Sequence, residues 1–245
     1  MKLRVHMLVF ATLATAAVAF SQNPVTMDGP FQVRYASNLI VGPLGGGGAA
    51  VVNITNTGAS ASMILTGQIP PQNNINGSLC VNIYTYAADE QEVACCSCLV
   101  TPNALWSAGV QTGLLNSTLT PSFPPEVVIK LISTIPFTNA VSGVQSCNPA
   151  MIDQSAALPG STGNKVPTPG FLANGLLAWG TSTHGFPLST GPGFQIAETP
   201  FLPATLSTAE LTRDVMECQF IQVLGSGQFG ICKGCDNKGL GASAQ

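Results

Sequence analysis

The segment LCVNIYTYAADEQEVACCSC, residues 79 to 98, decides the fold. Its first part, Leu79 to Tyr86, is rich in β-branched and aromatic residues and is therefore typical of a strand. A polar stretch, residues 87 to 91, separates it from a second strand-like run, Glu92 to Cys98. We predict an antiparallel hairpin whose two strands are joined by a turn at residues 87 to 91.

Four cysteines lie in this hairpin. Side chains alternate between the two faces of a strand, so Cys96 and Cys98 share one face and Cys95 lies on the other. Closing the turn places Cys80 opposite Cys98, or opposite Cys96 after a two-residue slip, and we predict a disulfide between Cys80 and one of these two. A one-residue slip would present Cys95 instead. The competing hypothesis joins Cys80 to Cys147 or to the C-terminal cysteines.

Eight cysteines occur in the chain, and each is a disulfide candidate: Cys80, Cys95, Cys96, Cys98, Cys147, Cys218, Cys232 and Cys235. An even count in an exported chain indicates a disulfide framework. The cluster at residues 95 to 98 and the pair at 232 and 235 also have spacings found in zinc sites. Only His184 is available as a histidine ligand beyond residue 21, and an oxidising compartment removes free thiolates. We predict structural disulfides with no metal site or other cofactor, and keep a metal or redox carrier as an alternative.

Further strands are predicted from alternating and β-branched residues at 31–35, 50–56, 127–134, 175–183 and 194–199. One late helix is predicted where Ser207 and Glu210 have the spacing of a capping box, and Gly225 would end it. Four residues at helical spacing would form its buried face: Leu211, Val215, Cys218 and Ile221. Strands separated by glycine and proline turns, with this helix, predict a mainly β, immunoglobulin-like β-sandwich stapled by disulfides.

The first 21 residues have the order of a secretory signal. Basic Lys2 and Arg4 precede an uncharged run, residues 7 to 20, that is too short for a comfortable membrane span. Small residues after the run predict cleavage behind Ala19 or Ser21. Residues 22 to 245 would then form a single secreted, mainly β domain without a transmembrane segment, located outside the cell, at its surface or in the periplasm.

Charged residues make up only 8% of the chain, against about 25% in ordinary globular proteins. Removing the two basic residues of the leader changes the formal net charge from −3 to about −5. A nucleic-acid-binding protein needs a basic surface, so nucleic acid is excluded as a partner. The composition suits an extracellular or envelope protein. Its partner stays open, with a component of the envelope or the extracellular matrix as the candidate.

Several patterns resemble catalytic or binding motifs. Ser182 and His184 can share one strand face, but the nucleophile elbow of serine hydrolases is missing. The carboxylates of Asp89, Glu90 and Glu92 could act as paired acids, but their place in the hairpin favours a solvated turn. GSGQFG at residues 225 to 230 follows a helix instead of a strand, unlike a dinucleotide fingerprint. Aromatic residues that could line a sugar platform are more often core: Trp106, Trp179, Tyr84 and Tyr86. No catalytic residue is assigned.

Three segments resemble an uncharacterised family of exported bacterial proteins: CVNIY at 80–84, CCSCLVTPN at 95–103 and GQFGICKGC at 227–235. The motif C-C-x-C-x-x-T-P-N carries most of this resemblance, together with the C-terminal C-x-x-C. The resemblance covers residues 31 to 135 and 195 to 241. It implies a bacterial source and export, and it implies no activity.

The leading hypothesis from the sequence is a secreted or cell-surface protein without catalytic activity, either a structural component or a binding module. It rests on the low charge, the disulfide framework and the missing catalytic set. The alternative is a secreted hydrolase that acts on carbohydrate or peptide, with acid groups on its loops.

Overall fold

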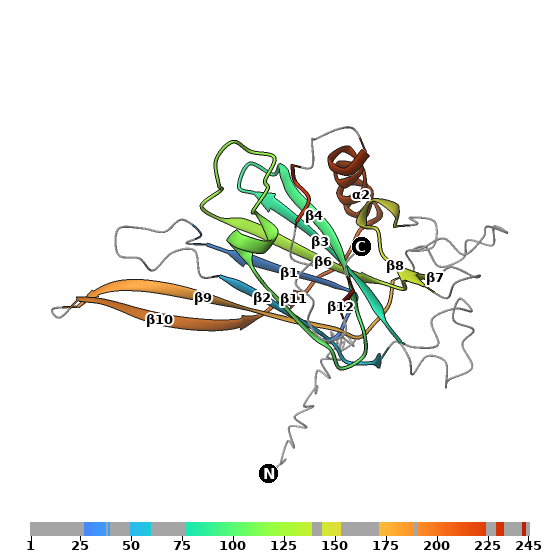
Figure 1. The fold of residues 1–245 in the computed structure, drawn as a ribbon, viewed down its shortest axis with the longest axis horizontal. Coiled ribbons are helices and arrows are strands. Elements are labelled where there is room, and N and C mark those ends of the chain that lie inside the picture. The colour runs from blue at the N-terminus through green and yellow to red at the C-terminus, as the bar shows by residue number, and fades with distance from the viewer. Residues whose placement is uncertain are drawn as a thin grey trace, which may run out of the picture.

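Two antiparallel sheets form most of the computed structural model (Figure 1). The structure describes residues 27–37, 39, 50–59, 77–138, 144–152, 172–188, 191–223, 229–232 and 242–243. The predicted signal at residues 1 to 21 and the predicted helix stop at Gly225 lie outside these ranges. No helix within them is long and apolar enough to cross a membrane.

The larger sheet has six strands in the order β11 (Leu202–Pro203), β1 (Phe31–Ala36), β6 (Val127–Thr134), β3 (Leu79–Ala87), β4 (Glu92–Val100) and β12 (Ala242–Ser243). The smaller sheet has four, in the order β10 (Gly191–Pro200), β9 (Leu176–Leu188), β2 (Val51–Asn56) and β5 (Leu105–Gly109). A separate pair joins β7 (Phe137–Thr138) to β8 (Gln145–Ser146). The described helices are η1 (Val110–Leu114), η2 (Pro149–Met151) and α2 (Thr208–Val223).

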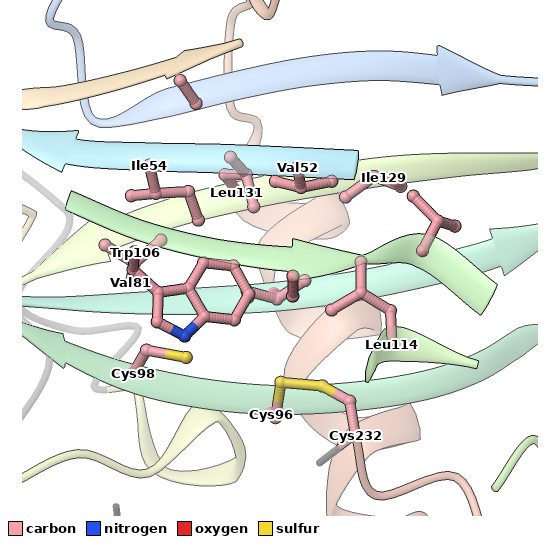
Figure 2. Close-up of a cluster of buried hydrophobic side chains, with 14 of the residues drawn as sticks. Val52, Ile54, Val81, Cys96, Cys98, Trp106, Leu114, Ile129, Leu131 and Cys232 are labelled. Atoms are coloured by element: carbon pink, nitrogen blue, oxygen red, sulfur yellow. A yellow bond between two sulfur atoms is a disulfide. The ribbon is translucent and has the colours of Figure 1, made fainter. Parts of the chain in front are cut away.

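The six-stranded sheet and the four-stranded sheet share one apolar core. Val52, Ile54 and Trp106 from the smaller sheet pack in the same buried cluster as Val81 and Leu131 from the larger one (Figure 2). Alternate residues along each of these strands face this cluster, as expected for a sandwich. The mainly β fold with one late helix and disulfides is therefore confirmed, while the immunoglobulin-like connection pattern stays a prediction.

Helix α2 covers the outer face of the six-stranded sheet. Its four predicted face residues are all buried in a second cluster beside Tyr84 and Ile132: Leu211, Val215, Cys218 and Ile221. The backbone N–H of Glu210 donates to Ser207 Oγ over 3.1 Å, which is the predicted N-terminal cap. The Glu210 carboxylate, however, does not complete the box and instead reaches Lys130, with Nζ to Oε1 at 3.0 Å.

The β3–β4 hairpin forms as predicted, but its register contains a bulge. Tyr86 lies opposite Glu92 and Thr85 lies opposite Ala94, so Val93 is an extra residue on β4. Beyond the bulge, every residue of β4 is displaced by one position relative to a regular ladder.

The bulge makes the predicted disulfide between Cys80 and Cys98 or Cys96 wrong. Cys80 lies opposite Leu99, and Cys98 lies opposite Val81 on the core side of the sheet. Cys80 therefore faces the other way, where it is bonded to Cys147 with the Cα atoms 5.4 Å apart.

Cys95 and Cys96 are adjacent in sequence and bonded on opposite faces of the sheet. Cys95 bonds Cys218 of α2, with the Cα atoms 5.8 Å apart, and Cys96 bonds Cys232 on the core side. Cys98 is disulfide-bonded as well, to a partner outside the described residues. The predicted division of the three cysteines between two faces is confirmed, and the disulfides fit a protein outside the reducing cytosol.

Peptide mapping of the unreduced protein should recover these links. We expect the pairs Cys80–Cys147, Cys95–Cys218 and Cys96–Cys232. Cys235 is the one cysteine left in the sequence for Cys98, so that link is expected too. A peptide that joins Cys80 to Cys96 or Cys98 would show a regular, unbulged hairpin.

Candidate functional site

The hairpin acids divide between solvent and interior. Asp89 and Glu90 are exposed at the turn, as predicted, whereas Glu92 is only 3% exposed and the prediction of a solvated position is wrong for it. Glu92 is the direct cross-strand partner of Tyr86, so both side chains lie on the face that α2 covers.

Glu92 belongs to a buried polar cluster assembled from three strands and α2. The Tyr86 hydroxyl oxygen lies 2.9 Å from Glu92 Oε2 and 2.7 Å from Asp214 Oδ1. Lys130 Nζ donates to the same Asp214 oxygen over 2.9 Å and lies 4.3 Å from the centroid of the Tyr86 ring. Asp214 of α2 is fully buried, and its carboxylate contacts these two side chains of the sheet.

Hydrogen counting assigns the charges in this cluster. The Tyr86 hydroxyl has one hydrogen and can donate to only one of its two carboxyl neighbours. Asp214 is paired with Lys130 and is therefore the ionised acceptor. Glu92 must then be protonated and donate to the Tyr86 oxygen, which leaves one negative and one positive charge in the interior.

The raised pKa of Glu92 agrees with its assignment as the protonated group. Burial raises the pKa of Glu92 to about 9, and the nearby Asp214 charge adds to the rise. Burial also raises the pKa of Asp214, against the hydrogen bonds from Tyr86 and Lys130. Burial alone would lower the pKa of Lys130, but its contacts with Asp214 and Glu210 outweigh burial and raise it.

The protonated Glu92 makes stability depend on pH. Its pKa is higher in the folded chain than its ordinary value of 4.5, so the folded state binds the proton more tightly than the unfolded state. Its contribution is complete below about pH 4.5 and is lost as the pH rises toward 9. At 1.36 kcal/mol per pH unit, the loss between pH 5 and pH 7 is about 2–3 kcal/mol.

We expect Glu92→Gln to remove this part of the pH dependence, because the amide can donate to Tyr86 without titrating. Urea unfolding of both proteins at pH 5, 6 and 7 measures it. The stability of the variant relative to wild type should rise steadily across the series. A constant difference would mean that Glu92 is ionised in the folded chain.

The cluster is closed to substrates. Glu92 is 3% exposed and Asp214 is fully buried, so neither carboxyl can reach a glycosidic or peptide bond. Acid–base catalysis requires hydrogen-bond reach to the reacting group. The arrangement instead fixes α2 to the sheet through one internal ion pair and a shared tyrosine.

One group of side chains in the described part of the chain has metal-like spacing. The ligand atoms of Glu92, Cys95 and Cys218 all lie within 4.8 Å of one another. The two sulfur atoms are joined to each other as a disulfide, so they are not the thiolates that a zinc site needs. In this oxidised form the group is structural.

Ser182 and His184 lie on β9, but Ser182 is engaged elsewhere. Arg34 Nη2 donates to Ser182 Oγ over 3.1 Å, and Nε donates to Thr199 Oγ1 over 3.2 Å. An added Cβ at Gly180 would overlap this guanidinium, so a larger residue there would displace the arginine side chain. The arginine joins β1 of one sheet to β9 and β10 of the other, which is a structural role.

The aromatic residues do not form a sugar platform. Trp106, Tyr84 and Tyr86 are at most 5% exposed, which confirms the core interpretation for these three. Trp179 on β9 is partly exposed. It lies opposite Pro200 in the last pair of the β9–β10 ladder.

The hairpin of β9 and β10 projects from the sandwich (Figure 1). The two strands pair without interruption from Leu188 and Gly191 to Trp179 and Pro200. On its other side, β9 pairs with β2 only from Leu176 to Thr181, so the hairpin reaches well past the sandwich (Figure 1). We call residues 182 to 197 the arm. Among the arm residues whose burial is described, Phe186, Leu188 and Ile196 are large, apolar and exposed.

Sequence reasoning missed Lys130 and Asp214. Each had a visible signal, because Asp214 stands four residues before Cys218 on the apolar stripe of α2, and Lys130 interrupts a β-branched strand. A single charge within an apolar face indicates a buried partner of opposite charge.

No protein-family model, curated protein or solved structure matches this chain, so its function has to be inferred from its own geometry.

Proposed function

We propose that the protein is a secreted or cell-surface component without catalytic activity, a structural or binding module, and that the arm is the element that makes contact. The observation that carries this proposal is the arm itself, a two-stranded extension with exposed Phe186, Leu188 and Ile196. Exposed apolar residues gathered on one projecting element are typical of interaction sites.

The remainder of the described molecule supports a scaffold role. The perturbed carboxyl groups of Glu92 and Asp214 are sealed beneath α2 and hold an internal contact. Disulfides join the large sheet to α2, to Cys147 and to Cys232, which stiffens the body that holds the arm. Such cross-linking suits an exported domain of low charge, and an envelope or matrix partner is consistent with it.

A shortened arm tests the proposal. Ser182 and Ala197 are a directly opposed pair, so residues 183 to 196 can be replaced by Asn-Gly, which closes a two-residue hairpin. Purified wild type, this variant and Glu92→Gln are sedimented alone and with polysaccharides and envelope fractions. The same mixtures are assayed for released sugars and peptides.

We expect wild type and Glu92→Gln to assemble or to bind, and the shortened variant to do neither. None of the three proteins should hydrolyse the polysaccharides or the envelope fractions. A melting temperature of the shortened variant close to that of wild type shows that the body of the protein is folded. Hydrolysis by wild type that Glu92→Gln abolishes would favour a hydrolase. Wild type that neither assembles nor binds, or a shortened variant that binds equally well, contradicts the proposal.

A further inference from the structure

The outer edge of β10 presents hydrogen-bonding groups to the open side of the sheet. Phe201 N donates to Ala178 O, so residues of β10 with odd numbers bond to β9. Thr57 N donates to Gly175 O, so residues of β9 with odd numbers bond to β2 and those with even numbers bond to β10. Residues of β10 with even numbers therefore direct their N–H and C=O groups away from β9, and no described strand pairs with that side.

Prolines occupy both ends of this edge. The residues with even numbers are Pro192, Phe194, Ile196, Glu198 and Pro200. Proline has no N–H, so only the three central residues can donate outward. The two prolines lie four residues to either side of Ile196, which makes the donor pattern of the edge symmetric about that residue.

We propose that β10 pairs antiparallel with β10 of a second copy of this chain, with Ile196 opposite Ile196 of the second copy. The inference rests on the proposed function, since it names the partner of the arm. In this register Phe194 lies opposite Glu198 of the second copy, and each such pair exchanges both of its N–H···O=C bonds. Pro192 lies opposite Pro200 of the second copy, where neither residue has an N–H to lose.

Other registers are worse. A slip of two residues places a proline opposite Phe194 or Glu198 and leaves outward groups unpaired. A slip of four residues in one direction places Glu198 opposite Glu198 of the second copy, and directly opposed like charges destabilise a pair. Glu198 is the only acidic residue on β10 and the strand has no basic one, so the centred register alone avoids repulsion and satisfies every outward donor.

The side chains add apolar contact to the centre of this ladder. Ile196 is 72% exposed, the highest value among the large apolar residues whose burial is described, and it would meet its own counterpart across the two-fold axis. At the tip, Phe186 and Leu188 lie over Gly193, where an added Cβ would be 2.6 Å from the Phe186 ring. Antiparallel arms place this apolar tip beside the base of the arm of the second copy.

The prolines also set the size of the assembly. They end the ladder after three residues on each strand and stop open-ended strand addition, a common way of protecting an edge. An interface formed by one short strand pair is small, so the dimer should be weak and dependent on concentration.

Cross-linking tests the register. Directly opposed residues of a hydrogen-bonded pair have Cα atoms about 5.5 Å apart, within disulfide range. Under mild oxidation Ile196→Cys should form a covalent dimer at concentrations where the matched control Glu198→Cys does not. A mixture of Glu198→Cys with Phe194→Cys should form the mixed dimer. Equal cross-linking of all single variants would indicate random collision and overturn the register.

Analytical ultracentrifugation tests the dimer without new cysteines. Ile196→Pro removes an outward N–H and no bond to β9, so it should leave thermal melting unchanged and give a monomer at every concentration. Ile196→Thr, which keeps the N–H, should retain at least part of the dimer. Wild type that stays monomeric at high concentration overturns this inference. If the shortened arm still loses envelope binding in that case, the proposed function stands and only its partner is wrong.

Discussion

Replacing both Cys95 and Cys218 with alanine should lower the free energy of unfolding by about 3 kcal/mol. Because the neighbouring Cys96–Cys232 disulfide remains, the shortest loop that Cys95–Cys218 closes contains about 15 residues, and closing it restricts the conformational entropy of the unfolded chain. It also joins α2 to the sheet beside the buried polar cluster. Changing both residues leaves no unpaired thiol, and urea unfolding monitored by circular dichroism measures the loss.

The matched control is the double replacement of Cys80 and Cys147, whose separation is 67 residues. The same entropy argument gives a loss of about 4 kcal/mol for it. This control should leave the helix contacts intact, while the first variant also loosens α2. A loss of less than 1 kcal/mol in the first variant would mean that packing alone holds the helix in place.

Replacing Lys130 with methionine should destabilise the protein by about 3–5 kcal/mol. The change leaves the ionised Asp214 buried without its cation, and Asp214 has no exposed surface through which water could compensate. Methionine keeps the length of the side chain and its contact with the Tyr86 ring. Chemical unfolding at pH 7 gives the magnitude.

The second variant for this test is Lys130→Met combined with Asp214→Asn. The amide oxygen can still accept from the Tyr86 hydroxyl and needs no cation, so stability should be largely restored. If the double variant is no more stable than Lys130→Met, the loss comes from packing and not from an unpaired charge. Wild-type stability in Lys130→Met would show that Asp214 is neutral in the folded chain.

Local patterns in the sequence predicted much of the body. The strand at Val127–Thr134 forms with the predicted bounds, because its β-branched residues are bounded by a proline pair. The helix forms at its predicted start, because Ser207 can cap it and four apolar positions repeat at helical spacing. In both cases the deciding information lies within a few adjacent residues.

The bulge at Val93 could not be predicted from alternation. A regular strand and a bulged one have the same composition, and the extra residue appears only when β3 and β4 are set side by side. One inserted residue exchanged the faces of Cys80 and Cys98 relative to each other, and so changed the disulfide partner of Cys80. Cross-strand pairing depends on the register of the whole ladder, which no single segment contains.

The arm and the polar cluster were missed for related reasons. Glycines and prolines at residues 185 to 193 indicated a break between two short strands, yet β9 and β10 continue through them. The ladder tolerates Pro187 and Pro192 because they are opposed at a pair whose backbone groups point outward. Lys130 and Asp214 lie 84 residues apart in sequence, and only the packing of α2 on β6 brings them together.

Residue-resolved amide hydrogen exchange tests most directly whether the arm is the contact element and a second copy its partner. The amides of Gln195, Ala197 and Thr199 bond to β9 and should be protected at every protein concentration. Those of Phe194, Ile196 and Glu198 point to the open edge and should exchange rapidly in dilute protein. We predict that these three become protected together as the concentration rises. Rapid exchange that persists in concentrated protein, or protection already complete in dilute protein, would contradict pairing with a second copy.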